Sequence, residues 1–234
     1  MLEQRSLEKE QMDNLQLSGK ELHDTLNGLT IINRLLGNTN ATLKAVKTEI
    51  KTAASPVKII DLGCGGGDNL RSIAQWCDKQ NREVHLTGLD GNQNILDYAK
   101  RQNTSQKEIQ YIQADILAKD FELPDCDLLI SSHFMYHFTD EQLIDFLKKS
   151  KLKITRKIIF SELSRSTVAY LLFKIFGPVM PFSKMVKQDG LRAIRRSFKK
   201  AELEHIFKEA GINALSIQWK WAFRYLVAAK TKTK

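Results

Sequence analysis

The feature that most constrains the fold of this chain is an apolar segment that runs directly into a glycine-rich turn. Residues 57–63 (VKIIDLG) are nearly all apolar, as in a strand that is buried on both faces. The run CGGGD follows, and a helical pattern then extends from about Gly67 to Lys79. A strand, a glycine turn and a helix in this order open a βαβ unit, in which a ligand can approach the backbone of the turn.

The alternation of short apolar runs with amphipathic segments continues as far as residue 163. It predicts further strands at 84–90, 109–115, 126–132 and 157–163, and helices at 93–101 and from a Thr139 cap through Lys151. After a helix at 196–211, residues 214–221 and 222–229 predict two last strands that form a hairpin at one edge. The chain is therefore expected to be an α/β protein with a doubly wound, mostly parallel sheet of seven strands.

The segments outside this alternation predict an arm and a lid. Residues 1–55 are expected to form an N-terminal helical arm, with one helix over 20–36 and a second, capped by Thr39 or Asn40, that ends before Ser55-Pro56. The remaining residues, 56–234, form the ligand-binding domain. Residues 164–198 interrupt its rhythm and predict a helical lid insertion, whose apolar run is too short and too interrupted to span a membrane.

The net charge of +9 is unevenly distributed along the chain. Residues 56–145 carry a net charge of −7 and residues 146–234 a net charge of +16. The acidic middle does not suit a uniform nucleic-acid binder, whereas the basic last third suits either solvated helices or contact with an anionic membrane surface. The first residues lack a signal-peptide pattern and the three cysteines are scattered, which predicts a cytoplasmic protein with free thiols.

Acidic residues around the glycine turn indicate which ligand it holds. Asp90 ends the second strand, where a carboxylate can accept hydrogen bonds from both hydroxyls of a ribose. Asp61 and Asp68 flank the turn and would repel a pyrophosphate, but they favour a sulfonium or an ammonium. The turn also lacks the third glycine of GxGxxG. Asp115 ends the third predicted strand, where it can accept from an adenine amino group. The pattern favours a cationic adenosine ligand without phosphate.

The motifs IIDLGCGGGDN, GLDGNQNILDYAK, QADIL and DLLISSHFMYHF resemble those of class I S-adenosylmethionine-dependent methyltransferases, in the same order and spacing. Within that class the chain is similar to small bacterial methyltransferases of polyketide and quinone-like lipid pathways. The resemblance implies S-adenosylmethionine (SAM) as cofactor. It places Asp61, Gly63, Cys64 and Gly65 at the methionine end, Asp90 with Gly91 and Asn92 at the ribose, Asp115 with Ile116 at the adenine, and Ser131 and Ser132 facing the sulfonium.

Two histidines and the lid are the candidates for acceptor chemistry. His133 and His137 follow the fourth strand, where a general base would meet an acceptor hydroxyl. Their spacing of four could also suit a metal, but no third ligand is evident and no metal is expected. Tyr136 and the lid residues Tyr170 and Phe173 predict a hydrophobic acceptor site. Four arginines, Arg165, Arg192, Arg195 and Arg196, are candidates to meet a carboxylate or phosphate at its edge.

The leading hypothesis is therefore SAM-dependent methyl transfer to a small, apolar metabolite that can carry an acidic group, with a hydroxyl as the favoured methyl acceptor. A nucleic-acid methyltransferase is an alternative, but SSHFMYH stands where amino-methylating enzymes of that kind carry an Asn/Asp-Pro-Pro-aromatic motif. A non-catalytic protein that retains the cofactor fold is another alternative, which the intact Asp61, Asp90 and Asp115 disfavour. The sequence leaves the acceptor and the oligomeric state open.

Overall fold

The core of the protein is one seven-stranded sheet, in a computed structural model that describes residues 2–231. The strands are β1 (Val57–Leu62), β2 (Val84–Asp90), β3 (Ile109–Gln113), β4 (Cys126–Ser132), β5 (Ile154–Leu163), β6 (Ala214–Lys220) and β7 (Arg224–Lys230). Their order is β3-β2-β1-β4-β5-β7-β6, and β7 runs antiparallel to both of its neighbours. The predicted fold class and the edge hairpin are confirmed.

Helices cover both faces of the sheet because successive side chains of each strand point to opposite sides. Ile59 packs in a cluster with α2 (Asn38–Thr52), α3 (Asp68–Lys79) and α4 (Gln93–Arg101). Ile60 and Leu62 pack in a second cluster with α5 (Asp140–Ser150) and α8 (Lys200–Glu209). This two-sided burial explains why the strand sequences are continuously apolar rather than alternating.

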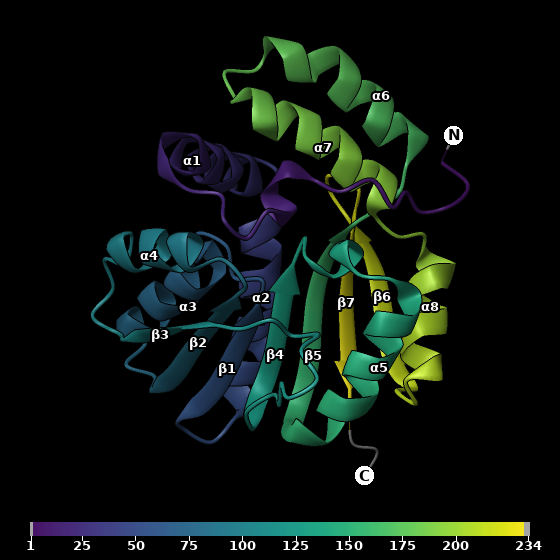
Figure 1. Cartoon of the computed structure of the whole chain (residues 1–234). Helices are drawn as coiled ribbons and strands as arrows, with labels where there is room; N and C mark the ends of the chain where they lie inside the picture. The colour runs from purple at the N-terminus through teal and green to yellow at the C-terminus, as the bar shows by residue number, and fades with distance from the viewer. Residues whose placement is uncertain (1, 232–234) are drawn as a thin grey trace.

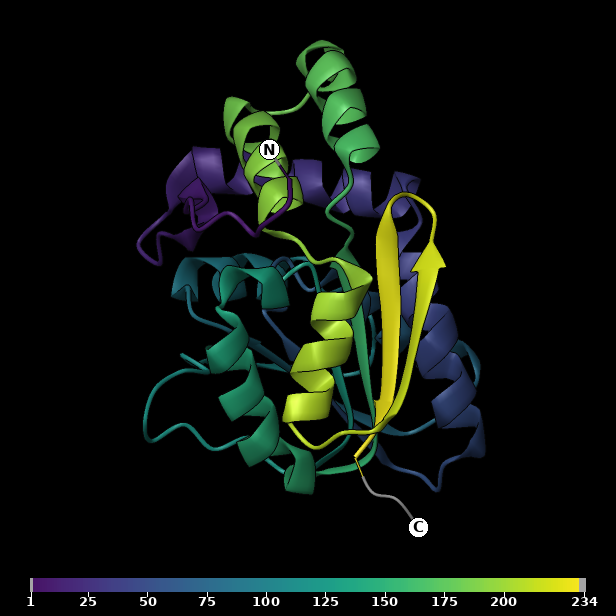
Figure 2. The same cartoon turned by 90° about the vertical axis from the view of Figure 1, so that its right-hand side faces the viewer.

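A third group of elements lies over the carboxyl ends of the parallel strands (Figure 1). It consists of an extended N-terminal segment, α1 (Gly19–Leu35), α6 (Thr167–Phe176) and α7 (Lys184–Arg196). Figure 2 shows that the tip of the β6–β7 hairpin reaches toward the same end. Single-turn 3-10 helices complete the chain: η1 (Gln11–Asp13), η2 (Met135–His137), η3 (Lys151–Lys153) and η4 (Gly177–Val179). No helix within residues 2–231 is long and apolar enough to cross a bilayer.

The ends of the predicted lid lie side by side, since Ser164 pairs with Phe198 in an isolated parallel bridge and Arg165 N donates to Phe198 O at 2.8 Å. This pairing divides the helix expected over 196–211: α7 ends at Arg196 and α8 begins at Lys200. The division of the chain at residue 55 stays a prediction, although Val46 and Ile50 of α2 pack within the core.

Several element boundaries differ from the sequence-based expectation. The helix α2 begins at Asn38, after Gly37 in a left-handed conformation (φ 77°), so Thr39 and Asn40 lie in its first turn and do not cap it. β3 ends two residues early, at Gln113, and β5 begins early, at Ile154. β7 begins at Arg224 because residues 221–223 form the hairpin turn.

Candidate active site

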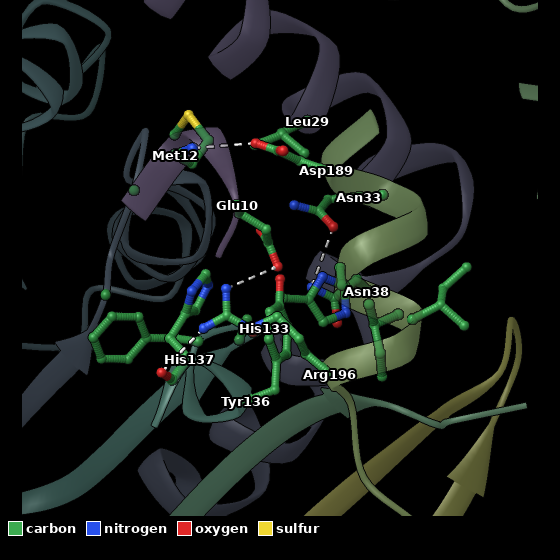
Figure 3. A pocket seen from close by; sticks show the side chains of 18 of the residues that line it. Glu10, Met12, Leu29, Asn33, Asn38, His133, Tyr136, His137, Asp189 and Arg196 are labelled. Carbon is green, nitrogen blue, oxygen red and sulfur yellow. Dashed lines mark hydrogen bonds and ion pairs between the residues drawn. The ribbon is translucent and has the colours of Figure 1, made fainter. Parts of the chain in front are cut away.

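A cavity of about 880 Å³ lies between the carboxyl ends of the strands and the elements that cover them. Its walls come from the glycine turn, the N-terminal segment, α1, η2, the inner sides of α6 and α7, and the hairpin tip. Figure 3 shows its polar side, where side chains from the N-terminal segment, η2 and α7 point toward one another. The volume suits a small-molecule ligand, since such sites span roughly 300–1,000 Å³.

The glycine turn forms one wall with its backbone. Gly63 adopts φ +60°, and a Cβ at this position would lie 2.2 Å from the ring of Phe134, which follows β4. Gly65 adopts φ +51°, and no atom lies within 4 Å of the place where its Cβ would be. A left-handed backbone and this open space make Gly65 a point where a ligand can contact the main chain directly.

Asp90, at the end of β2, is oriented by the turn beside it. Gly65 N donates to its Oδ2 at 3.2 Å, and Asn92 N donates to its Oδ1 at 3.0 Å. Burial raises the pKa of Asp90, and the backbone donors oppose that rise. Each carboxylate oxygen retains lone pairs toward the cavity, so the side chain can accept two further hydrogen bonds, as a vicinal diol requires. Asp115 also lines the cavity and accepts from Leu117 N at 2.9 Å.

The surroundings of Asp61 indicate which ligand charge the site favours. Its side chain is buried, and neither carboxylate oxygen has a hydrogen-bond partner among the described residues. Burial, together with the charges of Asp90 and Asp68, raises the pKa of Asp61 well above its ordinary value, although Asn69 opposes the rise. Three carboxyl groups around one turn disfavour a phosphate and favour a cationic ligand group. The residues therefore fit SAM, which carries a sulfonium and an ammonium.

The two histidines after β4 have different surroundings. His137 donates through Nδ1 to Asp13 Oδ1 at 2.5 Å, because a carboxylate can only accept, and Arg196 Nη1 donates to Asp13 Oδ2 at 2.6 Å. Burial raises the pKa of Asp13, but His137 and Arg196 outweigh burial and hold it well below its usual range. In neutral His137 the Nε2 atom thus keeps its lone pair. His133 is also at the cavity, but its buried Nε2 has no partner in the described chain.

The comparisons with known proteins agree with this geometry. A family model described as "Methyltransferase domain" matches residues 59–152. Among curated relatives, the ubiquinone biosynthesis O-methyltransferase of Acinetobacter baylyi is 24% identical over 159 residues, which cover 66% of this chain and 63% of that protein. The carboxy-S-adenosyl-L-methionine synthase of Campylobacter hominis is 24% identical over 186 residues, covering 74% of this chain and 77% of that one. The matched part is thus less than two thirds of the first relative's length.

Solved structures share the fold and include complexes with the cofactor or its product. Human N-acetylserotonin methyltransferase in complex with SAM has a TM-score of 0.63 and 14% identity, with 92% of this chain and 57% of that chain covered. Magnesium protoporphyrin IX methyltransferase from Synechocystis with bound SAH has a TM-score of 0.55 and 16% identity, with 83% of each chain covered. The methyltransferase domain matched over residues 59–152 and the shared fold support a class I SAM-dependent methyltransferase. They likewise support SAM as the cofactor.

Several of the predicted site residues line the cavity of this methyltransferase. They are Gly63, Cys64, Gly65, Asp90, Gly91, Asp115, Ile116, Ser132, His133, Tyr136, His137 and Phe173. Their individual roles stay predictions, but the fold brings them to one place. Ser132 Oγ accepts from Asn69 Nδ2 at 3.0 Å, so this hydroxyl is held at the end of β4.

Other predicted residues lie behind the cavity wall. Ser131 is buried and donates to Leu62 O at 3.0 Å, so its hydroxyl cannot face a sulfonium. It precedes Ser132 by one position, and neighbouring strand residues point to opposite faces. Asn92 is a buried cap of α4 that accepts from Asn94 N and donates to Leu17 O. Asp61 likewise lies beneath the turn rather than on the cavity surface.

Most of the lid residues predicted to bind the acceptor lie outside the cavity. Arg165 is buried outside the cavity, where it pairs with Glu202 and donates to the carbonyl oxygens of Leu2, Glu3 and Ser197. Arg195 and Arg192 pair with Glu8 on the outer surface. Tyr170 is half-buried and also lies outside the cavity. Of the four arginines, only Arg196 lines the cavity.

The N-terminal segment contributes side chains that the sequence did not reveal. Glu10 lines the cavity and lies 3.8 Å from Arg196 Nη1 (Figure 3). Asp13 also lines the cavity, and its Oδ2 lies 2.6 Å from the same nitrogen. Arg5 donates to Tyr136 O and Phe138 O, which ties the segment to η2. Residues 2–17 have no apolar periodicity, so no pattern marked them. The only signal in the sequence was that this segment carries acidic residues whereas the lid is basic.

One buried acid beside the site leads to a pH prediction. Glu162, at the end of β5, accepts from Met135 N and Phe134 N, and its Oε2 is unpartnered. Burial raises the pKa of Glu162 from 4.5 to about 8, against the effect of those two amides. The unfolded chain releases this proton at lower pH than the folded chain, so stability falls as the pH rises between these values.

We therefore expect Glu162→Gln, which keeps an oxygen for the two amides, to raise the melting temperature near pH 8 by roughly 2–4 °C. Near pH 4.5 the variant and the wild type should melt together. Calorimetric scans across this range test the prediction, and Glu204→Gln on the exposed surface of α8 serves as control. A Glu162→Gln curve parallel to the wild-type curve at all pH values would show that the carboxyl titrates normally.

Proposed function

We propose that this methyltransferase transfers the methyl group of SAM to a hydroxyl oxygen of a small, apolar acceptor, with His137 as the general base. The observation that carries the proposal is the His137–Asp13 pair at 2.5 Å in the wall of a largely apolar cavity that also contains the glycine turn and Asp90. SAM supplies the methyl group together with its own sulfonium leaving group. The protein then has to align the acceptor, exclude water and take up a proton.

The residues that would hold SAM divide along its length. We assign the turn Gly63–Gly65 to the methionine end, where the ammonium would stabilise the ionised form of the buried Asp61. We assign Asp90 to the ribose hydroxyls, because its oxygens are already oriented by two backbone donors. Asp115 and Ile116 are assigned to the adenine, one as a hydrogen-bond acceptor and the other as an apolar contact.

His137 suits the role of base better than His133. Burial and the charge of Arg224 lower the pKa of His133 to about 3, so this imidazole is a weak base at neutral pH. His137 is paired with an ionised Asp13, which stabilises the imidazolium that forms when Nε2 takes the acceptor proton. Neutral His133, with its unpartnered Nε2, suits a hydrogen bond that positions the acceptor.

The hydrophobic character of the acceptor is supported by the other side of the cavity. Leu29, Leu172, Phe173, Phe176 and Met180 line it from α1 and the lid. An aromatic or alkyl body would bury apolar surface there at roughly 25 cal/mol per Å². The buried Arg196 is already paired with Asp13, so an acidic group on the acceptor is not required by the arrangement.

The proposal is tested by incubating the protein with methyl-tritiated SAM and a series of alkylcatechols and alkylphenols. We expect tritium to enter the organic phase as an aryl methyl ether, with a rate that rises with alkyl length until the cavity is filled. SAM binding by calorimetry without transfer to any compound, but with transfer to RNA or DNA, would favour the alternative of a nucleic-acid methyltransferase. SAM binding without transfer to either class would favour a non-catalytic protein.

A further inference from the structure

The mouth of the cavity is bordered by apolar side chains that are exposed to solvent. Leu36, Leu172, Phe176, Met180 and Trp221 all line the cavity, yet each is at least 36% exposed. They come from the end of α1, from α6 with the turn after it, and from the hairpin tip. We call these five residues the rim. Phe176 is 54% and Trp221 67% exposed, which is unusual for large apolar side chains in a water-soluble setting.

The apolar surface continues outward from the rim. Leu171 and Ile175 on the outer side of α6, and Val179 in η4, are exposed, and Val179 is 81% exposed. Trp219 is exposed on β6 and packs edge-on against Phe223, which itself lines the cavity. Figures 1 and 2 both place α6 and the hairpin tip at the same end of the molecule, beyond the carboxyl ends of the parallel strands.

The rim is held by a buried arginine. Arg224 is 1% exposed, and its Nη1 donates to Leu36 O at 2.7 Å and to Trp221 O at 2.9 Å. These bonds join the end of α1 to the hairpin tip. Two of the rim residues, Leu36 and Trp221, are therefore presented by a backbone that hydrogen bonds hold in place.

The positive charge around the rim indicates which kind of partner would cover this surface. Residues 163–188 and 210–234 contain no Asp or Glu. Lys174 lies on α6 and Lys220 ends β6 beside the hairpin tip, while Lys184 begins α7, which packs against α6. A second copy of the chain would bring like charges together on this face, which disfavours self-association. Apolar and aromatic side chains interspersed with lysines match the interface of an anionic bilayer.

We propose that the rim and the outer side of α6 dock on an anionic lipid surface, so that the mouth of the cavity opens onto the bilayer. Docking does not depend on the proposed methyl transfer. A corollary, that an amphiphilic acceptor passes from the bilayer into the cavity, does rest on the proposed methyl transfer. The reaction would then draw on an acceptor with low solubility in water.

Vesicle co-sedimentation tests the docking. We expect the wild type to bind vesicles of equal parts phosphatidylglycerol and phosphatidylcholine at least 10-fold more tightly than vesicles of phosphatidylcholine alone. Val179→Asp and Ile175→Asp should each weaken binding to the anionic vesicles about 10-fold. Leu152→Asp is the matched control, because Leu152 is 74% exposed in η3 at the opposite end of the molecule. This variant should bind the anionic vesicles as tightly as the wild type does.

The charge contribution has its own pair of variants. Lys174→Glu with Lys184→Glu should weaken binding at least 10-fold, whereas Lys148→Glu with Lys208→Glu, on the exposed surfaces of α5 and α8, should have a much smaller effect. Equal losses from both pairs would indicate a non-specific effect of net charge and overturn the proposed orientation.

Tryptophan fluorescence locates the contact. The chain has three tryptophans, and Trp76 lies on α3, where it packs with Lys47 away from the rim. In a Trp76→Phe variant the signal comes from Trp219 and Trp221 alone. Its emission should shift to shorter wavelength with the anionic vesicles and stay unchanged with phosphatidylcholine.

An unshifted emission without co-sedimentation would overturn the proposal. Dimers in light scattering that Val179→Asp dissociates would also overturn it, because a second copy would then cover the rim. SAM affinity is measured in parallel for every variant. Because the variants at Ile175, Val179, Lys174 and Lys184 leave Asp90 and the glycine turn untouched, loss of vesicle binding with normal SAM affinity and normal transfer to a soluble catechol separates docking from the chemistry.

Discussion

SAM will bind the Asp90→Asn variant about 100-fold more weakly than the wild type. The carboxylate of Asp90 accepts one backbone hydrogen bond at each oxygen and keeps lone pairs toward the cavity. An amide has only one acceptor oxygen, so its NH2 group is forced against either Gly65 N or Asn92 N. The variant loses a charge-assisted bond to the ribose and gains a contact between two donors. Isothermal titration calorimetry gives the dissociation constant directly.

Asp97→Asn is the matched control for this measurement. Asp97 lies on α4, a few residues beyond Asp90, and its partners are Gln93 and Lys100 on the same helix. We expect its SAM affinity to equal that of the wild type. Circular dichroism and the melting temperature show whether the Asp90→Asn protein is folded. A folded variant with wild-type affinity would remove Asp90 from the ribose site.

Replacement of His137 by alanine will lower kcat by about 100- to 10,000-fold, with little change in SAM affinity, because general-base catalysis contributes on that scale. Asp13→Asn should also lower kcat, because the amide no longer stabilises the imidazolium and its NH2 group must face a donor, either His137 Nδ1 or Arg196 Nη1. The double variant should be no slower than His137→Ala alone, because both residues act through one proton transfer.

Two other histidines provide the comparison for His137. His85 is exposed on β2, and His85→Ala should leave the rate unchanged. His133→Gln should raise KM for the acceptor more than it lowers kcat, in keeping with a positioning role for its unpartnered nitrogen. A His137→Ala enzyme that turns over at the wild-type rate would show that alignment alone drives the transfer.

The cofactor half of the site was predictable because its residues follow strands. In a parallel sheet the carboxyl ends of neighbouring strands meet at one edge, so Gly65, Asp90 and Asp115 are close in space although they are distant in sequence. This reasoning does not distinguish between two neighbouring residues at the end of a strand, as Ser131 and Ser132 illustrate. The strand pattern locates both at the end of β4, but the facing of each depends on where the strand ends.

The acceptor half was largely unpredictable because its contacts are ionic and remote in sequence. Arg165 was expected at the cavity edge, since it is a cation next to an apolar lid. The structure instead uses its guanidinium to satisfy backbone carbonyls of residues 2, 3 and 197. Asp13 lies in a segment without periodicity, and its partners Arg196 and His137 are 183 and 124 positions away. Local patterns carry no information on such pairings.

The position of Asp13 has a consequence for the order in which the enzyme matures on the ribosome. The parts that are assigned to SAM lie within residues 61–116, and an emerging chain can assemble them as soon as the neighbouring strands pair. Asp13 precedes this region, but Arg196, which holds it in place, follows 183 positions after it. Ordering the arm over so long a loop waits until both ends are present. A nascent chain therefore completes the place proposed for its cofactor well before Asp13 and the proposed base are held together.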